Sequence, residues 1–418
     1  MEVSSAKAAE WRAGWPLPLV SAIGYAAGIV YLYSLGVFIG PLEREFGWSR
    51  VAVTSGLTVV SVLFVVLAPF TGLFIDRWGA RRAALPGLVF YGAALAGLSL
   101  AGPSLWTWWA LWAFVALGAL CVQAAVWTTA VASRFDKSRG LAMAITLCGA
   151  GIGAAIAPIL GQLYILELGW RGAYLALGAT VVAFSTPLVF LFFFDAADKA
   201  AASGGTGVRD RTAVPGLGLR ESILSGRFLR IAVISLAVVT AMTSLLVHAV
   251  PMLSAKGLDK STAAAAAGFI GLGSIAGRLA GGLLLDRISG AVVGAVAFSL
   301  PIPVCLALFH FEGHTGAAFA ITFLLGLSLG GEVDVLAYLT SRYFGLRNFG
   351  TLFAIIVALQ TLALGIGPLI AGYVFDLYGT YQPLLLGLIP VFVVAVGAVA
   401  TLGPYPSPES LQPQVQST

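Results

Sequence analysis

The most constraining feature of this sequence is a series of apolar runs, each about as long as a membrane is thick. A helix needs about 20 mostly apolar residues to cross the hydrocarbon core. Inside lipid, backbone polar groups must be satisfied within the segment, which favours helices. We therefore predict an all-α membrane protein with twelve transmembrane helices. The runs lie near residues 18–40, 52–75, 84–102, 106–133, 141–165, 172–194, 229–253, 262–285, 290–311, 316–341, 350–375 and 381–402.

The shortage of charge agrees with a protein that has lipid as its main solvent. Only 10% of the 418 residues are charged, whereas soluble domains carry about 25%. The net charge of +5 comes from basic residues scattered over short loops, so no nucleic-acid surface is expected. The three cysteines, Cys121, Cys148 and Cys305, fall in apolar runs and form no disulfide or metal-binding pattern.

The distribution of Lys and Arg predicts the orientation. With the N-terminus and residues 195–228 placed inside, 17 of the 23 basic residues fall on the inner side and 5 on the outer side, and Arg278 lies within a helix. Cytoplasmic loops carry such an excess. Both termini are therefore expected to be cytoplasmic.

The chain also resembles itself at an offset of 210 residues. Pro41 aligns with Pro251, and Asp76-Arg77 aligns with Asp286-Arg287. General hydrophobicity does not explain matches at Pro and charged positions. We predict two related six-helix halves, 1–194 and 229–402, joined by a cytoplasmic linker at 195–228 and followed by a cytoplasmic tail at 403–418.

A charged loop gives the first resemblance to a known family. The stretch from Gly72 to Arg82, GLFIDRWGARR, resembles the loop signature between the second and third helices of the major facilitator superfamily. The resemblance implies a substrate site between the two halves near mid-membrane, exposed alternately to each side. We expect a conformational latch whose charged contacts form and break as the halves rock, although these residues could instead only fix the topology. The latch residues are Asp76, Arg77, Arg81, Arg82, Asp286 and Arg287.

Three charged residues remain deep within predicted helices. Arg278, Glu332 and Asp334 lie at a similar depth, roughly 12–15 Å from the inner boundary. Charges there are costly and usually have a partner or a function. Arg278 could pair with an acid, or its guanidinium could bind the carboxylate of a substrate through two hydrogen bonds. The two interpretations are compatible.

The two acids and one histidine are the candidates for proton coupling. Glu332 and Asp334 are two residues apart, roughly 200° around a helix, so only one is expected to face the site squarely. A buried carboxyl can exchange a proton near neutral pH. His248 could relay protons or be a packed, neutral histidine. Tyr33, Gln123, Trp127 and Gln360 are candidate substrate contacts, with packing as the alternative for each.

Within the superfamily, three stretches resemble the monocarboxylate-porter branch, which includes the oxalate:formate antiporters. They are Ser34 to Arg50, Gly277-Arg278 before Gly282, and Ser341 to Gly345. In that branch the eighth-helix arginine at this spacing binds the substrate carboxylate, which implies this role for Arg278.

The sequence also departs from this branch. Tyr33 stands where animal members carry a lysine, and Ser274 stands where they carry an acid. The oxalate antiporter has a lysine on its eleventh helix, whereas this chain has none there, and Gln360 lies in the region. One membrane cation favours a monoanion over a dianion. The acids at 332 and 334 are expected to replace the missing one.

We therefore predict a secondary active transporter of a small organic carboxylate (a monocarboxylate or an aromatic acid), working by proton symport in a bacterial inner membrane. The alternatives are an organic-anion exchanger of the oxalate:formate type and a proton-driven exporter of hydrophobic solutes. The stretch 113–119 lacks the fourth-helix arginine of many exporters. No enzymatic activity and no cofactor are expected, because the proton gradient supplies the energy. The expected partners are an organic anion, protons and membrane lipids, and the expected state is a monomer.

Overall fold

The computed structural model describes residues 10–12, 14–135, 138–194, 217–285, 287–345 and 348–406. Every element in this part is helical. The first part of the chain forms α2 (Pro16–Gly28), α3 (Val30–Phe46), α4 (Arg50–Trp78), α5 (Ala80–Gly97), η1 (Leu98–Leu100), α6 (Leu105–Leu120), α7 (Ala124–Arg134), α8 (Arg139–Leu147), α9 (Gly149–Thr180), η2 (Val181–Ser185) and α10 (Thr186–Phe192). The second part forms α12 (Leu219–Leu224), α13 (Gly226–Ala255), α14 (Lys260–Leu285), α15 (Gly290–Ser299), α16 (Pro301–Phe309), α17 (Thr315–Phe344), α18 (Phe349–Tyr378) and α19 (Gln382–Ala400).

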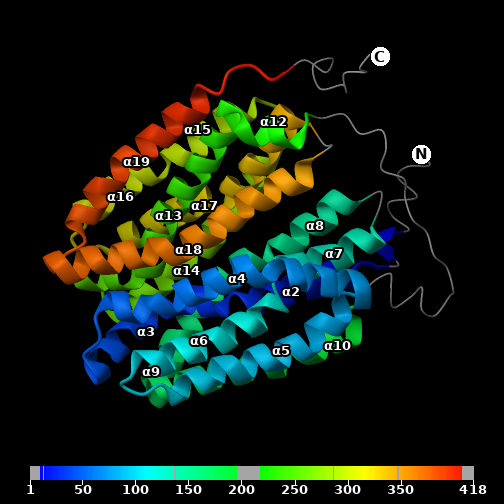
Figure 1. Cartoon of the computed structure of the whole chain (residues 1–418). Helices are drawn as coiled ribbons and strands as arrows, with labels where there is room; N and C mark the ends of the chain where they lie inside the picture. Colours follow the sequence, from blue (N-terminus) through cyan, green and yellow to red (C-terminus); the bar gives the residue numbers. More distant parts are fainter. Residues whose placement is uncertain are drawn as a thin grey trace, which may run out of the picture.

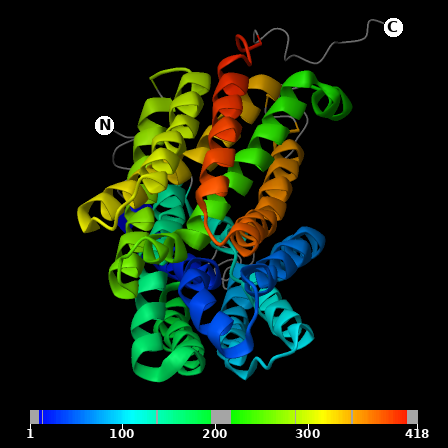
Figure 2. The ribbon, with the colours of Figure 1, turned by 90° about the vertical axis from the view of Figure 1, so that its left-hand side faces the viewer.

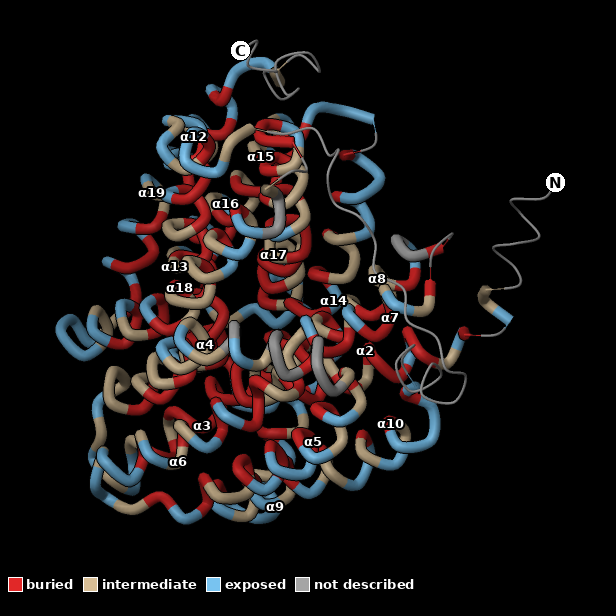
Figure 3. Tube along the Cα trace, turned by 45° about the vertical axis from the view of Figure 1, so that its right-hand side comes forward, coloured by how far each residue is buried: buried red, intermediate tan, exposed pale blue. Residues whose placement is uncertain are grey.

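The helices lie in two groups, which Figures 1 and 2 show from two directions. We call α2–α10 the N-terminal bundle and α12–α19 the C-terminal bundle. They meet where α4 packs on α18, α9 on α14, and α3 on α13. Figure 3 shows exposed residues recurring along α9 and α10 at the edge of the molecule. Large apolar side chains such as Leu163 and Phe190 are among these exposed residues, as expected for helices that face lipid.

Eleven segments of the described chain are long and apolar enough to cross a membrane. The sequence predicts twelve, and the difference lies at the predicted spans 141–165 and 172–194. In the structure these two run together from Leu141 to Phe192 over 52 residues. The backbone leaves the helical conformation at Gly169, with φ 68° and ψ 172°. A left-handed φ is open to glycine, so Gly169 allows the chain to bend without a loop.

The predicted linker and tail lie only partly within the described residues. Of the linker, residues 195–216 lie outside them, and α12 and the start of α13 occupy the rest. Leu217 is held to the C-terminal bundle, because its N–H donates to Phe344 and its carbonyl accepts from Asn348, at 3.0 and 2.8 Å. Of the tail, residues 407–418 lie outside the description.

Glycines bring α14 and α17 unusually close together. A Cβ atom added at Gly277 would lie 2.1 Å from the carbonyl oxygen of Leu327, and one at Gly330 would lie 2.0 Å from that of Ser274. Gly273 and Gly326 make the same kind of contact one turn away. Small residues allow such approach between membrane helices. The two backbones are therefore in contact next to Arg278.

Gly277→Ala is expected to destabilise the protein, whereas Gly282→Ala on the same helix is not. Both substitutions remove a glycine from α14, so the gain in helix propensity is shared. A Cβ at residue 282 meets nothing within 4 Å, whereas one at 277 forces the helices apart. Overpacking costs about 1–3 kcal/mol. Thermal unfolding in detergent measures the difference, and equal midpoints for the two variants would contradict this account of the packing.

Candidate functional site

The close contact of α14 and α17 places Arg278 beside Asp334. The Nη1 atom of Arg278 donates to Oδ1 of Asp334 at 3.0 Å. The arginine side chain is 14% exposed and the aspartate side chain 30% exposed. The pair is thus partly reachable rather than sealed in the protein. A guanidinium has five N–H donors in a planar fork, so one contact to Asp334 leaves donors for a second carboxylate.

Residues of the N-terminal bundle lie within electrostatic reach of this pair. Arg278 interacts with Tyr25 on α2 and Tyr33 on α3. Cys148, at the junction of α8 and α9, interacts with both Arg278 and Asp334. Both bundles therefore contribute to the surroundings of Arg278. Of these N-terminal residues, the sequence singled out Tyr33 as a substrate contact, and it gave Tyr25 and Cys148 no site role.

Glu332 faces a different direction from Asp334. Ser328, one turn before Glu332 on α17, hydrogen-bonds the Ala297 carbonyl of α15 at 2.8 Å. Residues four apart share a helix face, so Glu332 is turned towards the interior of the C-terminal bundle. It is 2% exposed, and its Oε1 has no hydrogen-bond partner among the described residues. Asp334 is thus the acid that faces Arg278.

Two breaks in membrane-spanning helices lie against each other. The helix breaks at Ile29 between α2 and α3, and again at Cys121–Gln123 between α6 and α7. A Cβ added at Gly28 would lie 2.6 Å from the carbonyl oxygen of Val122, so glycine allows the two breaks to touch. The indole N–H of Trp127 donates to the same oxygen at 2.8 Å.

The four predicted substrate contacts have different surroundings in the structure. Trp127 is fully buried, packs on Phe193 and satisfies the backbone at a helix break. Gln123 is half-buried at that break and directly precedes α7. Gln360 is buried on α18, and its amide nitrogen has no hydrogen-bond partner among the described residues. Tyr33, the fourth, interacts electrostatically with Arg278.

The predicted latch is described only in part. The side chains of Asp76 and Arg77, and the whole of Asp286, lie outside the described residues. Arg81 donates to the carbonyls of Phe190 and Phe193, and its guanidinium lies 3.9 Å from the ring centre of Phe194. These contacts cap the C-terminus of α10 in the same bundle, where a cation is favoured. Arg82 and Arg287 are exposed.

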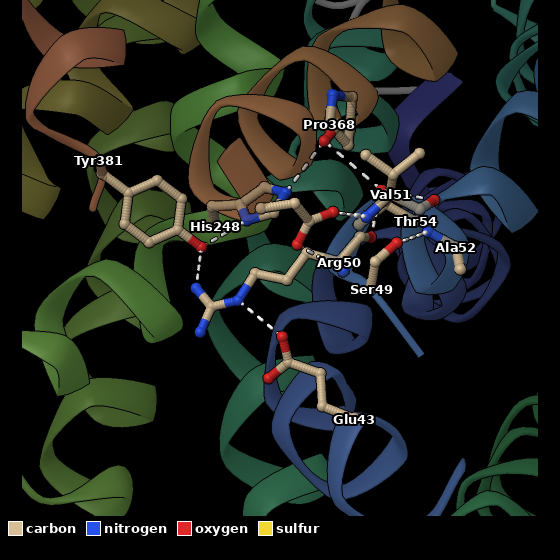
Figure 4. Close-up of polar contacts among 10 residues, drawn as sticks. Glu43, Ser49, Arg50, Val51, Ala52, Thr54, His248, Pro368 and Tyr381 are labelled. Carbon is tan, nitrogen blue, oxygen red and sulfur yellow. Dashed lines mark hydrogen bonds and ion pairs between the residues drawn. The ribbon is translucent and has the colours of Figure 1, made fainter. Parts of the chain in front are cut away.

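A second polar cluster joins the two bundles, as shown in Figure 4. Arg50, the first residue of α4, donates through Nε to Glu43 at 2.8 Å and through Nη1 to the hydroxyl of Tyr381. Its guanidinium lies 3.4 Å from the ring centre of Phe375. Glu43 belongs to the N-terminal bundle, whereas Tyr381 and Phe375 belong to the C-terminal bundle. We call Glu43, Arg50, His248, Asp376 and Tyr381 the interbundle cluster.

Asp376 completes the cluster by capping a helix of the other bundle. Its two carboxylate oxygens accept from the backbone N–H groups of Arg50 and Val51 at 3.0 and 3.1 Å. These N–H groups begin α4 and have no partner within the helix. A carboxylate at a helix N-terminus is also favoured by the helix dipole. Charge and hydrogen bonding therefore both hold α18 to α4 here.

His248 is fixed within the cluster by both of its ring nitrogens. Nε2 lies 3.0 Å from the carbonyl oxygen of Pro368, which can only accept, so Nε2 carries a proton. In a neutral ring, Nδ1 accepts from the hydroxyl of Tyr381 at 2.8 Å. Both ring nitrogens then have partners, as in a packed, neutral histidine. His248 contacts neither Arg278 nor Asp334, and a role in proton relay stays a prediction.

Sequence comparison places the chain among membrane transporters. Residues 21–353 match the Major Facilitator Superfamily. Bovine monocarboxylate transporter 13 is 23% identical over 381 residues, which cover 88% of this chain and 84% of that protein. An uncharacterized MFS-type transporter of Escherichia coli, YhjX, is 24% identical over 85% of this chain and 86% of its own length. A match to mouse monocarboxylate transporter 6 covers 42% of this chain and 37% of that protein at 24% identity.

A solved structure shows the same fold. The nucleoside transporter NupG, solved as a mutant, superposes with a TM-score of 0.75, covering 93% of this chain and 99% of that one, at 12% identity. At this identity the likeness concerns the fold alone. The family match covers most of the chain and agrees with the apolar helices in two bundles. The chain therefore belongs to the Major Facilitator Superfamily, a family of multi-pass membrane transporters.

Proposed function

We propose that this protein carries a small organic monocarboxylate across the membrane together with a proton. The observation that carries the proposal is the Arg278–Asp334 pair, which is partly exposed and whose arginine interacts electrostatically with Tyr25 and Tyr33 of the other bundle. A substrate carboxylate can take over the guanidinium donors that Asp334 holds, because both groups are carboxylates. The bovine and mouse relatives are named as monocarboxylate transporters, which supports the same substrate class.

In this scheme Asp334 carries the proton. When a substrate carboxylate occupies Arg278, Asp334 loses its cation and becomes a lone charge in the membrane. Protonation removes that cost, so substrate and proton are expected to bind together. One anion and one proton then cross with no net charge. Glu332 is the second candidate for this role, and its orientation away from Arg278 disfavours direct coupling.

We further propose twelve crossings in two moving halves, with both termini cytoplasmic in a bacterial inner membrane. The 52-residue segment from Leu141 to Phe192 would be about 78 Å long if straight, enough for two crossings with a bend at Gly169. The excess of Lys and Arg near the predicted inner loops supports the orientation. The Escherichia coli relative supports a bacterial setting. The interbundle cluster then lies at the outer end.

Uptake into proteoliposomes tests the substrate and the coupling together. We expect uptake of at least one labelled monocarboxylate, such as a lactate-like or aromatic acid, and stimulation by an inward proton gradient. Vesicles preloaded with unlabelled acid test the exchanger alternative. If uptake requires the preloaded acid and ignores the gradient, the protein is an exchanger. Transport of hydrophobic cations, with no carboxylate moved, would favour the exporter.

Tyr33→Phe and Trp127→Phe separate a substrate contact from a packing residue. Tyr33→Phe is expected to raise KM several-fold, because it removes a hydroxyl that interacts electrostatically with Arg278. Trp127→Phe should leave KM unchanged and lower the thermal midpoint, because the Val122 carbonyl loses its donor. An unsatisfied buried carbonyl costs about 1–3 kcal/mol. A raised KM in Trp127→Phe alone would reverse these assignments.

A further inference from the structure

An open groove lies at one end of the C-terminal bundle, away from the Arg278 pair. It encloses about 660 Å³ between α15 and α19. Val292 and Val296 of α15 line one wall, and Val396 and Ala400 of α19 line the other. The α15 wall runs from Ser289 to Ser299, about 15 Å along the helix. Because the groove is open and runs along membrane-spanning helices, its apolar walls face the lipid.

Two tyrosines line the polar end of this groove, and an arginine lies against the ring of each. The rings of Tyr343 and Tyr405, both lining residues, lie 5.0 Å apart between centres. The guanidinium of Arg227 lies 5.4 Å from the ring centre of Tyr343, and that of Arg342 lies 5.0 Å from the ring centre of Tyr405. The two cations therefore flank one tyrosine pair.

The tyrosine pair is held in place by backbone contacts. The hydroxyl of Tyr343 donates to Gly403 at 2.6 Å, and that of Tyr405 accepts from the N–H of Gly290 at 2.9 Å. The chain after α19 is thereby fixed to the ends of α15 and α17. The positions of both tyrosines at the polar end of the groove are therefore fixed by hydrogen bonds to the backbone.

The arginines have positive charge that no described residue neutralises. Arg227 and Arg342 are exposed, and neither forms an ion pair within the described chain. None of the lining residues that the structure describes is acidic. Arg230, one turn after Arg227, adds a further cation at this end and donates to the carbonyl of Thr401 at 2.9 Å. Within the described part of the chain, the site therefore combines a cationic end that has no acidic partner with an apolar trough.

We propose that this groove binds an anionic phospholipid. Its phosphate would lie at the polar end of the groove, attracted by Arg227 and Arg342, and one acyl chain would lie in the trough between α15 and α19. Basic pockets between membrane helices recognise anionic head groups in this way. A water-soluble anion would use the arginines and leave the apolar walls uncovered, which is why a lipid fits better. The inference rests on the membrane-spanning fold and is independent of the proposed substrate.

Native mass spectrometry of the full-length protein, titrated with phosphatidylglycerol, tests the proposal. Each arginine near a membrane surface contributes about 1 kcal/mol to binding an anionic lipid, roughly fivefold in affinity. Arg227→Gln/Arg342→Gln should therefore weaken binding roughly 25-fold. Val296→Trp, which fills the trough and keeps both charges, should also weaken it. Arg220→Gln, an exposed arginine on α12, is the control and should bind as the wild type does.

Each alternative gives a distinct result. If Arg220→Gln weakens lipid binding as much as the double variant does, only the overall charge matters. If Val296→Trp binds the lipid as the wild type does, no acyl chain enters the groove. Competition by inorganic phosphate at millimolar concentration would identify an anion site instead of a lipid site. Phosphatidylcholine with the same chains should not displace phosphatidylglycerol. Unchanged thermal midpoints without lipid confirm that the variants fold, so each result bears on the groove itself.

Discussion

Arg278→Gln is expected to lose carboxylate uptake, with kcat/KM reduced at least roughly 30-fold, because a bound carboxylate that loses its hydrogen-bonded cation costs about 2–5 kcal/mol. The substitution keeps side-chain hydrogen bonding and removes the charge and the planar fork of donors. The expected loss concerns every carboxylate that the wild type transports. Arg278→Lys restores the charge without the fork, so it should recover part of the activity with a raised KM. Initial rates in proteoliposomes measure both.

A structural role for Arg278 predicts a different outcome for a double variant. Arg278→Gln leaves Asp334 without its partner at 3.0 Å, which is expected to lower stability. Arg278→Gln/Asp334→Asn removes both charges and should restore the thermal midpoint. If Arg278 binds substrate, the double variant is stable and inactive. If Arg278 only neutralises Asp334, the double variant regains uptake, and the proposed carboxylate site is wrong.

The sequence could indicate the charged pair because depth follows from counting residues along two helices. Arg278, Glu332 and Asp334 were predicted at one level, and their angular separation predicted that only one acid would face the site. Which acid it is depends on how α14 rotates against α17. That rotation is set by Gly273, Gly277, Gly326 and Gly330, whose contacts become evident only when the helices are packed.

Helix breaks are the main feature that periodicity could not predict. The apolar runs 18–40 and 106–133 read as continuous spans, whereas the structure breaks them at Ile29 and at Cys121–Gln123. At the second break, the indole N–H of Trp127 donates to the carbonyl oxygen of Val122. An apolar run does not reveal this role. Conversely, residues 166–171 read as a connection between spans, and the structure makes that connection at one non-helical residue, Gly169, rather than through a loop.

The interbundle cluster could not be predicted from the sequence for a different reason. Arg50 and Asp376 are 326 residues apart, and each lies at the end of a helix, where charges are usually solvated. A sequence alone gives no means of pairing two such ends. Of the cluster, only His248 was predicted to have a role. In the structure its ring nitrogens contact Tyr381 and Pro368, so His248 is part of the contacts that hold the two bundles together at this end.

Removing contacts of the interbundle cluster is expected to expose the interface between α4 and α18. Arg50→Ala/Asp376→Ala removes the cap on α4 and the bonds to Glu43 and Tyr381. A lost cap costs about 0.5–2 kcal/mol, and a lost charge-assisted hydrogen bond about 1.5–3 kcal/mol. The population open at this end should therefore rise at least roughly tenfold.

A cysteine placed below the cluster reports this opening. Thr58 lies two turns below Arg50 and donates to the Gly365 carbonyl of α18 at 3.0 Å, so Thr58→Cys in a background without Cys121, Cys148 and Cys305 probes the interface. A membrane-impermeant maleimide should label it faster in the double variant, in intact cells. Glu45→Ala/Arg171→Ala is the matched control, because it removes a 3.0 Å ion pair within the N-terminal bundle alone.

The side from which labelling rises also tests the proposed orientation. Faster labelling in intact cells means that the interbundle cluster closes the outer end, so that substrate bound at Arg278 leaves toward the cytoplasm. Faster labelling only in inverted vesicles would mean that the orientation is the opposite of the proposed one and that the interbundle cluster closes the cytoplasmic end. Unchanged labelling from both sides would mean that apolar and glycine contacts alone, such as Gly372 against Val51, hold the end shut. The charged cluster would then serve stability rather than alternating access.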